Sequence, residues 1–374
     1  MRITVLGLLV AQALTAGYQY QASVAIPAPS SGSLTNFTAV ISGTNALLKT
    51  VANSGQIQHT VTRVGQTVPA DLILSSDKAG ASLYAWGWDF YDGTAGSAKI
   101  WVLIPTYSAS TTIYVSFGNS AVSTYQGGSV GSEFDSSTNV AMHAANGTTL
   151  SLADSTSNAQ TASNYGSSNA SATTGEIDGA AYFNGSAGIT LPDSALTTPS
   201  TFTISLWFKR NGAQPTYGRL MEKGDSDNPP YSTYDILFNG SDSTSLIYEV
   251  GFSDGTPFGV TTATAAIADN TWYKADETWN DATKTLTGYL NGVFVASATS
   301  AKTLNSSAGR LQSWGTAIAS NNIADTLLTG SLDEMRFSAT ARSAAWLATE
   351  FANQSSPPAM SAFVTLAGSQ IFVF

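Results

Sequence analysis

The chain has no cysteine, few charged residues and no basic cluster. Without cysteine it can form neither disulfides nor thiolate metal sites. Charged residues make up only 11% of the 374, and 15 Lys and Arg face 25 Asp and Glu, which leaves a net charge of −10. Because nucleic-acid binding depends on neutralising phosphates with clustered cations, this acidic chain is not expected to bind nucleic acid.

Several catalytic and membrane signatures are also missing. There is no Gly-x-x-x-x-Gly-Lys phosphate loop and no Gly-x-Ser-x-Gly nucleophile elbow. The only two histidines, His59 and His143, have no acid beside them in a recognisable motif, so each is expected to be a surface or packing residue. No stretch reaches the roughly 18 apolar residues that a membrane span needs.

The residues that are abundant favour a folded protein with an uncharged polar surface. The apolar fraction is 43%, which is enough for a buried core, and Ser, Thr, Gly, Ala and Asn are common. Surfaces built from hydroxyls and amides are typical of secreted, cell-surface and virion proteins. We therefore expect an extracellular or virion location, and the length favours two domains.

Residues 1–16 allow two interpretations. One Arg, an apolar run and small residues resemble a short signal peptide that is cleaved after Ala13 or Ala16. The same residues also fit an ordinary first strand over Ile3 to Val10. The sequence does not decide between them.

Residues 17–120 predict a small β-sandwich domain. Short runs rich in Val, Ile, Thr and aromatic residues alternate with Gly, Pro, Asp and Ser, and no helical period is present. One stripe, formed by Tyr84, Trp86, Trp88 and Phe90, is either a core face or a binding platform. Residues 121–138 have the composition of a linker.

Residues 139–356 predict a second all-β domain that ends in a helix. Ser343 can cap a helix over 341–353, and Pro357-Pro358 stops it. Residues 357–374 then predict a C-terminal strand tail whose apolar end can pair with a sheet edge. The predicted fold class is therefore all-β, with two β-sandwich domains and one short C-terminal helix.

Three segments of the second domain carry a family resemblance. They are G-E-I-D-G-A-A-Y-F-N-G-S (175–186), T-F-T-I-S-L-W-F-K-R (201–210) and the strand-turn-helix stretch 328–351. Together they resemble a laminin-G-like jelly roll of the concanavalin A-like lectin/glucanase superfamily. The resemblance implies a lectin fold with loops at one end that carry binding.

The first domain resembles the small, uncharacterised β-domain that often precedes such jelly rolls in bacterial surface and phage proteins. The resemblance rests on the segments 71–77, 86–92, 98–105 and 112–119. Similar domains carry an acid after the first aromatic residue. Here that position is Gly87, whereas the second acid is kept as Asp89.

The jelly-roll resemblance implies a structural calcium site. Residues 154–160 are similar to the D-S-x-G-N-x-N loop of these domains, which lies beside the acidic pair of the last strand. Carried over, Asp154 and Asp333 are anionic ligands and Asn158 supplies a carbonyl oxygen. Ser157 and Gln160 depart from the family pattern, and an Asx-turn that needs no metal is the alternative.

Aromatic residues near predicted loops are the candidate ligand-binding residues. Trp314 is flanked by polar residues and Gly315, and Tyr231 and Tyr234 belong to a loop that begins with Pro229-Pro230. In a jelly roll, such side chains at the rim can stack on a sugar. The predicted ligand is a glycan or cell-surface polymer.

Hydrolysis is not expected. The glucanase signature Glu-x-Asp-x-x-Glu is broken, since Glu176 and Asp178 are followed by Ala181. Asp333 and Glu334 are adjacent on a strand, and strand alternation predicts opposite faces for them. The sequence thus predicts a non-enzymatic attachment protein. A purely structural subunit of a virion, fibre or extracellular assembly is the alternative, and self-association into a homo-oligomer stays open.

Overall fold

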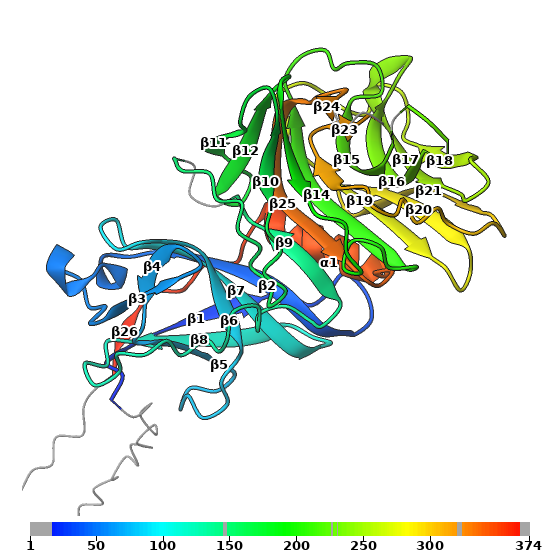
Figure 1. Cartoon of the computed structure of the whole chain (residues 1–374). Helices are drawn as coiled ribbons and strands as arrows, with labels where there is room; N and C mark the ends of the chain where they lie inside the picture. Colours follow the sequence, from blue (N-terminus) through cyan, green and yellow to red (C-terminus); the bar gives the residue numbers. More distant parts are fainter. Residues whose placement is uncertain (1–16, 145–147, 226, 230, 320–323, 367–374) are drawn as a thin grey trace, which may run out of the picture.

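The computed structural model describes residues 17–144, 148–225, 227–229, 231–319 and 324–366. Within these ranges the chain forms two β-sandwich domains with one α-helix between them (Figure 1). The expected all-β class is confirmed. The candidate leader 1–16 and the apolar end Ile371–Phe374 lie outside the described residues.

The small domain packs a four-stranded sheet against a three-stranded one. The sheets have the orders β26-β1-β8-β5 and β2-β7-β6, and β3 and β4 form a separate hairpin. The elements are β1 (Tyr20–Ile26), β2 (Leu34–Thr44), η1 (Ala46–Leu48), η2 (Val51–Asn53), β3 (Thr60–Arg63), β4 (Gln66–Pro69), β5 (Leu72–Ser75), β6 (Trp86–Asp92), β7 (Ser97–Tyr107), β8 (Thr111–Phe117) and β26 (Val364–Thr365).

The aromatic stripe of the small domain belongs to its core. Trp86 and Trp88 are buried and meet edge to face with ring centroids 5.4 Å apart. The pairing of β6 with β7 slips between Trp88 and Phe90, so Asp89 occupies a β-bulge. Of the two interpretations of the stripe, the core interpretation holds for the two tryptophans.

The second domain is a jelly roll of two large antiparallel sheets. A seven-stranded sheet, β10-β13-β22-β15-β16-β17-β18, faces an eight-stranded region, β11-β12-β25-β14-β19-β20-β21 with β9 paired to β25. The first set of bounds is β9 (Thr138–Met142), β10 (Ser163–Gly166), β11 (Ser171–Thr174), β12 (Gly179–Asn184), β13 (Ala187–Leu191), β14 (Phe202–Arg210), β15 (Arg219–Gly224), β16 (Ser232–Asn239) and β17 (Asp242–Gly251). The remaining strands are β18 (Pro257–Thr261), β19 (Tyr273–Asn280), β20 (Thr285–Leu290), β21 (Val293–Thr299), β22 (Gln312–Trp314), β23 (Ala317–Ile318), β24 (Ala324–Asp325) and β25 (Thr329–Ser338).

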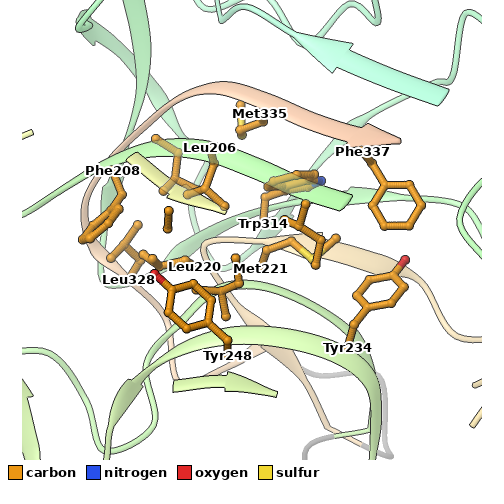
Figure 2. Packing of buried hydrophobic residues seen from close by; sticks show 14 of the residues in the cluster. Leu206, Phe208, Leu220, Met221, Tyr234, Tyr248, Trp314, Leu328, Met335 and Phe337 are labelled. Atoms are coloured by element: carbon orange, nitrogen blue, oxygen red, sulfur yellow. The ribbon is translucent and has the colours of Figure 1, made fainter. Parts of the chain in front are cut away.

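The core of the jelly roll lies between the two sheets (Figure 2). Leu206, Phe208, Met335 and Phe337 from the eight-stranded side meet side chains of the seven-stranded sheet, among them Met221, Tyr234, Tyr248 and Trp314. Such alternation of inward apolar and outward polar residues is what fixes the register of each strand.

A β-bulge in β25 changes which residues face outward. Two residues of β25 lie opposite one residue of β14, and Glu334 has a φ of 49°, in the left-handed region. Because Leu332, Met335 and Phe337 all point into the core, Asp333 and Glu334 both lie on the outer side of the sheet. The expectation that these two acids face opposite sides is wrong for this reason.

Helix α1 (Ala344–Ser355) joins the two domains. Ser343 caps it by accepting a hydrogen bond from the Trp346 backbone N–H at 3.2 Å. On the jelly-roll side, Gln354 accepts from Trp207 Nε1 at 2.7 Å. On the other side, the Asn353 amide accepts from the Val40 backbone N–H at 2.7 Å and donates to the Val40 carbonyl at 3.0 Å. The helix is therefore held by both sandwiches.

Neighbouring segments complete this contact between the domains. The segment predicted as a linker, 121–138, packs between them: Thr38 donates to the Glu133 carbonyl at 2.6 Å, and Arg342 pairs with Asp135 at 2.6 Å. After the helix the chain returns to the small domain, where β26 pairs with β1. No helix in the described part of the chain is long and apolar enough to cross a membrane.

Candidate functional site

The loop predicted to bind calcium is an Asx-turn whose acid is satisfied by the protein itself. Asp154 accepts hydrogen bonds from the backbone N–H groups of Ala141 and Thr156, both at 3.0 Å, and from that of Gln160 at 2.9 Å. The Thr156 hydroxyl donates a further bond at 2.9 Å. The Asn158 amide donates to the Asn139 carbonyl at 3.0 Å. The calcium ion stays a prediction.

Asp333, the other predicted calcium ligand, anchors the turn before β12. One of its carboxylate oxygens accepts from the backbone N–H groups of Glu176 and Ile177, at 2.9 and 3.0 Å. Burial, reinforced by the neighbouring Glu334, raises the pKa of Asp333 well above its usual range. Among the described residues, Asp333 and Asp154 share no hydrogen-bond donor.

Two of the three predicted rim aromatics are core residues. Trp314 is fully buried in a short strand and packs between the sheets. Tyr234 is equally buried; its hydroxyl donates to the Thr197 carbonyl at 2.6 Å and accepts from Gln312 at 3.0 Å. Their assignment to a binding rim is wrong because both point inward. Tyr231 is half-buried just before β16, and its role stays a prediction.

A groove at the edge of the seven-stranded sheet is the better candidate site. It has a volume of about 610 Å³ and lies where β10 pairs with β13 at the end of the sheet. Its side chains are Asn164, Tyr165, Ser167, Ser186, Ala324 and Leu327. No local motif marks β10, and the segment 175–186, which contains the turn after β12, indicated the fold and not a binding site.

Two glycines shape this groove. Gly166 has a φ of 103°, and a Cβ there would stand 2.5 Å from the Ser186 carbonyl oxygen. Gly185 has a φ of 81° in the turn between β12 and β13. Both positions favour glycine because other residues rarely adopt these angles, so the backbone itself forms part of the wall.

The described residues that line the groove carry no charge. Its lining offers one aromatic ring, hydroxyls and an amide, together with two apolar side chains. The side-chain amide of Asn164 is held in place, because its Oδ1 accepts a hydrogen bond from the Ala170 backbone N–H at 3.0 Å. Such a lining suits a neutral polar ligand, because hydroxyls and amides can exchange hydrogen bonds with it and an aromatic ring can cover an apolar face.

The outer face of the same sheet holds a row of three acids. Glu222, Asp235 and Glu249 occupy paired positions on β15, β16 and β17. The Ser232 hydroxyl bridges the first two, at 2.7 Å from Glu222 and 3.2 Å from Asp235. Arg219 pairs with Asp235 at 3.3 Å. Only strand register brings these acids together, so no local sequence pattern indicates them.

Burial controls the electrostatics of this acid row. It raises the pKa of Glu222 to about 7 and that of Asp235 to about 7, and the nearby Arg219 only partly opposes the shift. Ile318 of β23 lies against Glu222, to which its backbone N–H donates at 3.3 Å. A covered pair of this kind can hold a proton, but the protein itself occupies the space in front of it.

Known structures resemble the fold. The binding domain of Paraclostridial Mosquitocidal Protein 1 has a TM-score of 0.45 and 13% identity over 57% of this chain and 52% of that one. Domain 4 of AbnA, an extracellular arabinanase from Geobacillus stearothermophilus in complex with arabinotriose, has a TM-score of 0.42 and 22% identity over 56% and 98%. The CBM40 of the Ruminococcus gnavus IT-sialidase, bound to α2,3 sialyllactose, has a TM-score of 0.36 and 14% identity over 41% and 85%.

These likenesses concern the sandwich fold alone, and the chain spans about half the length of the first of these structures. No curated protein matches the sequence. Two family models do match it. Residues 69–149 match a domain of unknown function, DUF2341, and residues 183–348 match the concanavalin A-like lectin/glucanases superfamily. The chain therefore carries a laminin-G-like domain of the concanavalin A-like lectin/glucanases superfamily, preceded by a DUF2341 domain.

Proposed function

We propose that this chain is a non-enzymatic attachment protein, outside the cell or on a virion, whose jelly roll binds a glycan or a surface polymer. The observation that carries the proposal is the groove of about 610 Å³ between β10, the turn before β13, Ala324 and Leu327, whose described lining is uncharged. It has room for a short oligosaccharide, and ligand sites generally fall in the range of roughly 300–1,000 Å³.

The chemistry of the lining supports a neutral sugar over an anionic ligand. Phosphate, sulfate or carboxylate groups are recognised by Arg, Lys or clustered backbone N–H groups, and the groove contains no cationic side chain. Tyr165 offers a flat ring, while Ser167, Ser186 and Asn164 offer short polar groups at its sides. We assign Tyr165 the stacking role.

The arrangement of acids supports binding rather than hydrolysis. A glycosidase needs two carboxyl groups about 5–9.5 Å apart that both reach the substrate. Glu222 and Asp235 are neighbours, but each is almost fully buried, and they are engaged by Ser232, Arg219 and the Ile318 backbone. A sugar in the groove has no acid in its lining.

An alternative role as a structural subunit has one observation in its favour. Edge strand β21 exposes Val293 and Phe294, at 67% and 56% of their surface, and an exposed apolar edge can pair with a neighbour's sheet. This role predicts large particles in solution, which size-exclusion chromatography with light scattering detects. Intact mass of the native protein also tests secretion, since cleavage after Ala13 or Ala16 shortens the chain.

The binding proposal is tested on a glycan array with the purified full chain, followed by titration of the neutral and sialylated oligosaccharides that bind. We expect neutral glycans to bind and Tyr165→Ala to weaken them at least tenfold, which corresponds to about 1.4 kcal/mol. The matched control is Phe294→Ala, an exposed aromatic on the other sheet, which should bind like the wild type.

Equal affinity of Tyr165→Ala and the wild type for the glycan would contradict the proposal that this groove is the binding site. Binding of anionic glycans alone would also contradict it, because the lining offers them no cation.

A further inference from the structure

The contact between the two domains contains a buried cluster that resembles an unused metal-binding set. Asp89 lies on β6 of the small domain, whereas His143 directly follows β9 and Glu334 lies on β25, two strands that pair in the jelly roll. One ligand atom of each residue lies within 4.8 Å of those of the other two, and all three residues are buried. Neither the glycan groove nor the acid row of the seven-stranded sheet uses them.

The distances inside the cluster suit a small divalent ion. His143 Nδ1 lies 2.8 Å from Glu334 Oε1 and 3.6 Å from Asp89 Oδ1. Two ligand atoms that each stand about 2.0–2.1 Å from a tetrahedral ion are about 3.3–3.4 Å apart. These two separations lie on either side of that value, and the Asp89 and Glu334 oxygens lie within 4.8 Å of each other, so side-chain adjustments would place the three atoms around one ion.

Unsatisfied polar atoms point to a missing partner. Asp89 is 1% exposed, yet neither of its carboxylate oxygens has a hydrogen-bond partner among the described residues. His143 Nε2 and Glu133 Oε2 are also buried and have no hydrogen-bond partner among the described residues. A buried carboxylate without donors is costly, and a bound cation removes that cost directly.

The backbone around the two acids is specialised. Asp89 sits at the bulge of β6 and Glu334 at the bulge of β25, where its φ is 49°. Bulges re-aim side chains and are frequent beside functional sites. Glycine at position 87 makes room for a further acid, since a Cβ there would stand 2.3 Å from Glu133 Oε1. Two bulges and one glycine thus bring carboxylates from separate segments to one place.

The surroundings hold the ligands in position. The His143 ring stacks between Trp101 and Phe134, with centroid distances of 5.4 and 6.0 Å. Arg336 donates to Glu334 Oε2 from Nε at 3.2 Å and from Nη2 at 2.6 Å, which leaves Oε1 directed at His143. Partners of this kind orient metal ligands in known sites.

We propose that Asp89, His143 and Glu334 bind a divalent transition-metal ion of the zinc type, which holds the small domain against the jelly roll. Glu133, whose carboxylate lies beside Gly87, is the candidate for a fourth ligand. An imidazole together with carboxylates suits Zn²⁺, whereas Ca²⁺ takes oxygen ligands. This ion differs in place and ligands from the calcium predicted at Asp154, and the inference does not depend on the glycan groove.

The test is metal binding by the full chain, purified without an affinity tag that binds metal. After loading with Zn²⁺ and removal of the excess, mass spectrometry should find about one Zn²⁺ per chain. Stripping the ion with a chelator should lower the melting temperature by at least ~5 °C. Asp89→Asn and His143→Gln should each weaken Zn²⁺ binding at least tenfold. His59→Gln, which changes the only other histidine, is the matched control and should bind like the wild type.

Wild-type protein that retains less than about a tenth of an equivalent of Zn²⁺, with a melting temperature that the chelator leaves unchanged, overturns the proposal. So does equal Zn²⁺ binding by His143→Gln and His59→Gln. If the variants do not fold, Co²⁺-loaded wild type decides: intense visible absorption of a four-coordinate ion supports the site, and the weak absorption of a six-coordinate ion contradicts it.

Discussion

The two sheets of the jelly roll differ in what covers their outer faces. The eight-stranded sheet is covered by α1 and, beyond it, by the small domain, and its outward charges are paired in buried contacts. The seven-stranded sheet carries its own acid row under β23 and opens at its β10–β13 edge into an uncharged groove. The eight-stranded sheet thus forms the contact between the domains, and the seven-stranded sheet carries the groove proposed to bind a ligand.

The paired charges at the domain contact form an alternating chain. Acidic and basic side chains take turns along it, in the order Asp276, Lys274, Glu350, Arg336, Glu334, His143 and Asp89. Every link joins a carboxylate to a cationic or basic group, and each of these residues is buried. Because a buried charge is stable only with its partner, removing one member should be far more damaging than changing an exposed pair.

The largest effect should come from breaking this chain at its centre. The Glu350 carboxylate lies 2.9 Å from Lys274 Nζ and 3.2 Å from Arg336 Nη1, and Glu350→Gln removes this negative charge from both cations. We expect a loss of about 3–5 kcal/mol in the free energy of unfolding, measured by chemical denaturation. The matched control is Asp254→Asn, which removes an exposed pair with Lys302 and should cost far less, because solvent screens an exposed ion pair. Equal losses would mean that the buried pairs do not hold the interface.

A smaller effect is expected where α1 meets the small domain. Asn353→Ala removes the amide that pairs with both backbone groups of Val40 in the middle of β2. Two buried backbone groups would then lack partners, so we expect a loss of about 2 kcal/mol, again from chemical denaturation. Ser355→Ala, at the exposed end of the same helix, is the control and should change stability by less than about 0.5 kcal/mol.

The acid row of the seven-stranded sheet predicts its own contribution to the pH dependence of stability. Glu222 and Asp235 have folded pKa values raised to about 7, against about 4 in an unfolded chain. Their stabilising contribution is therefore complete below about pH 4 and is lost as pH rises through 7. The double variant Glu222→Gln/Asp235→Asn should lose less stability between pH 5 and 8 than the wild type, by on the order of 1–2 kcal/mol. Parallel pH profiles of the two proteins would contradict this assignment.

Local sequence patterns predict much of the fold and little of the site. The strand Phe202–Arg210 and the helix with its Ser343 cap follow from alternation and capping, which depend on near neighbours. Alternation puts Trp86 and Trp88 on one face but does not decide that this face is the core. Trp314 was predicted to lie in an exposed loop because its polar neighbours are typical of one. In the structure Gln312 and Ser313 are buried as well, within a three-residue strand.

The bulges could not be predicted from the sequence. Alternation assigns Asp333 and Glu334 to opposite faces, and only the extra residue in β25 puts both outside. His143 has no acid near it in sequence, yet it meets Glu334, 191 residues away, and Asp89 from the other domain. Contacts of this range depend on the docking of two folded sandwiches, which no local pattern records.

The division of labour between the two sheets is tested most directly by one glycan titration on three proteins: wild type, Tyr165→Ala and Asn353→Ala. The account predicts that Tyr165→Ala loses at least tenfold in affinity with unchanged stability, whereas Asn353→Ala binds like the wild type although it unfolds more easily. Loss of binding in Asn353→Ala together with full binding in Tyr165→Ala would contradict it, since the ligand would then depend on the domain contact and not on the groove.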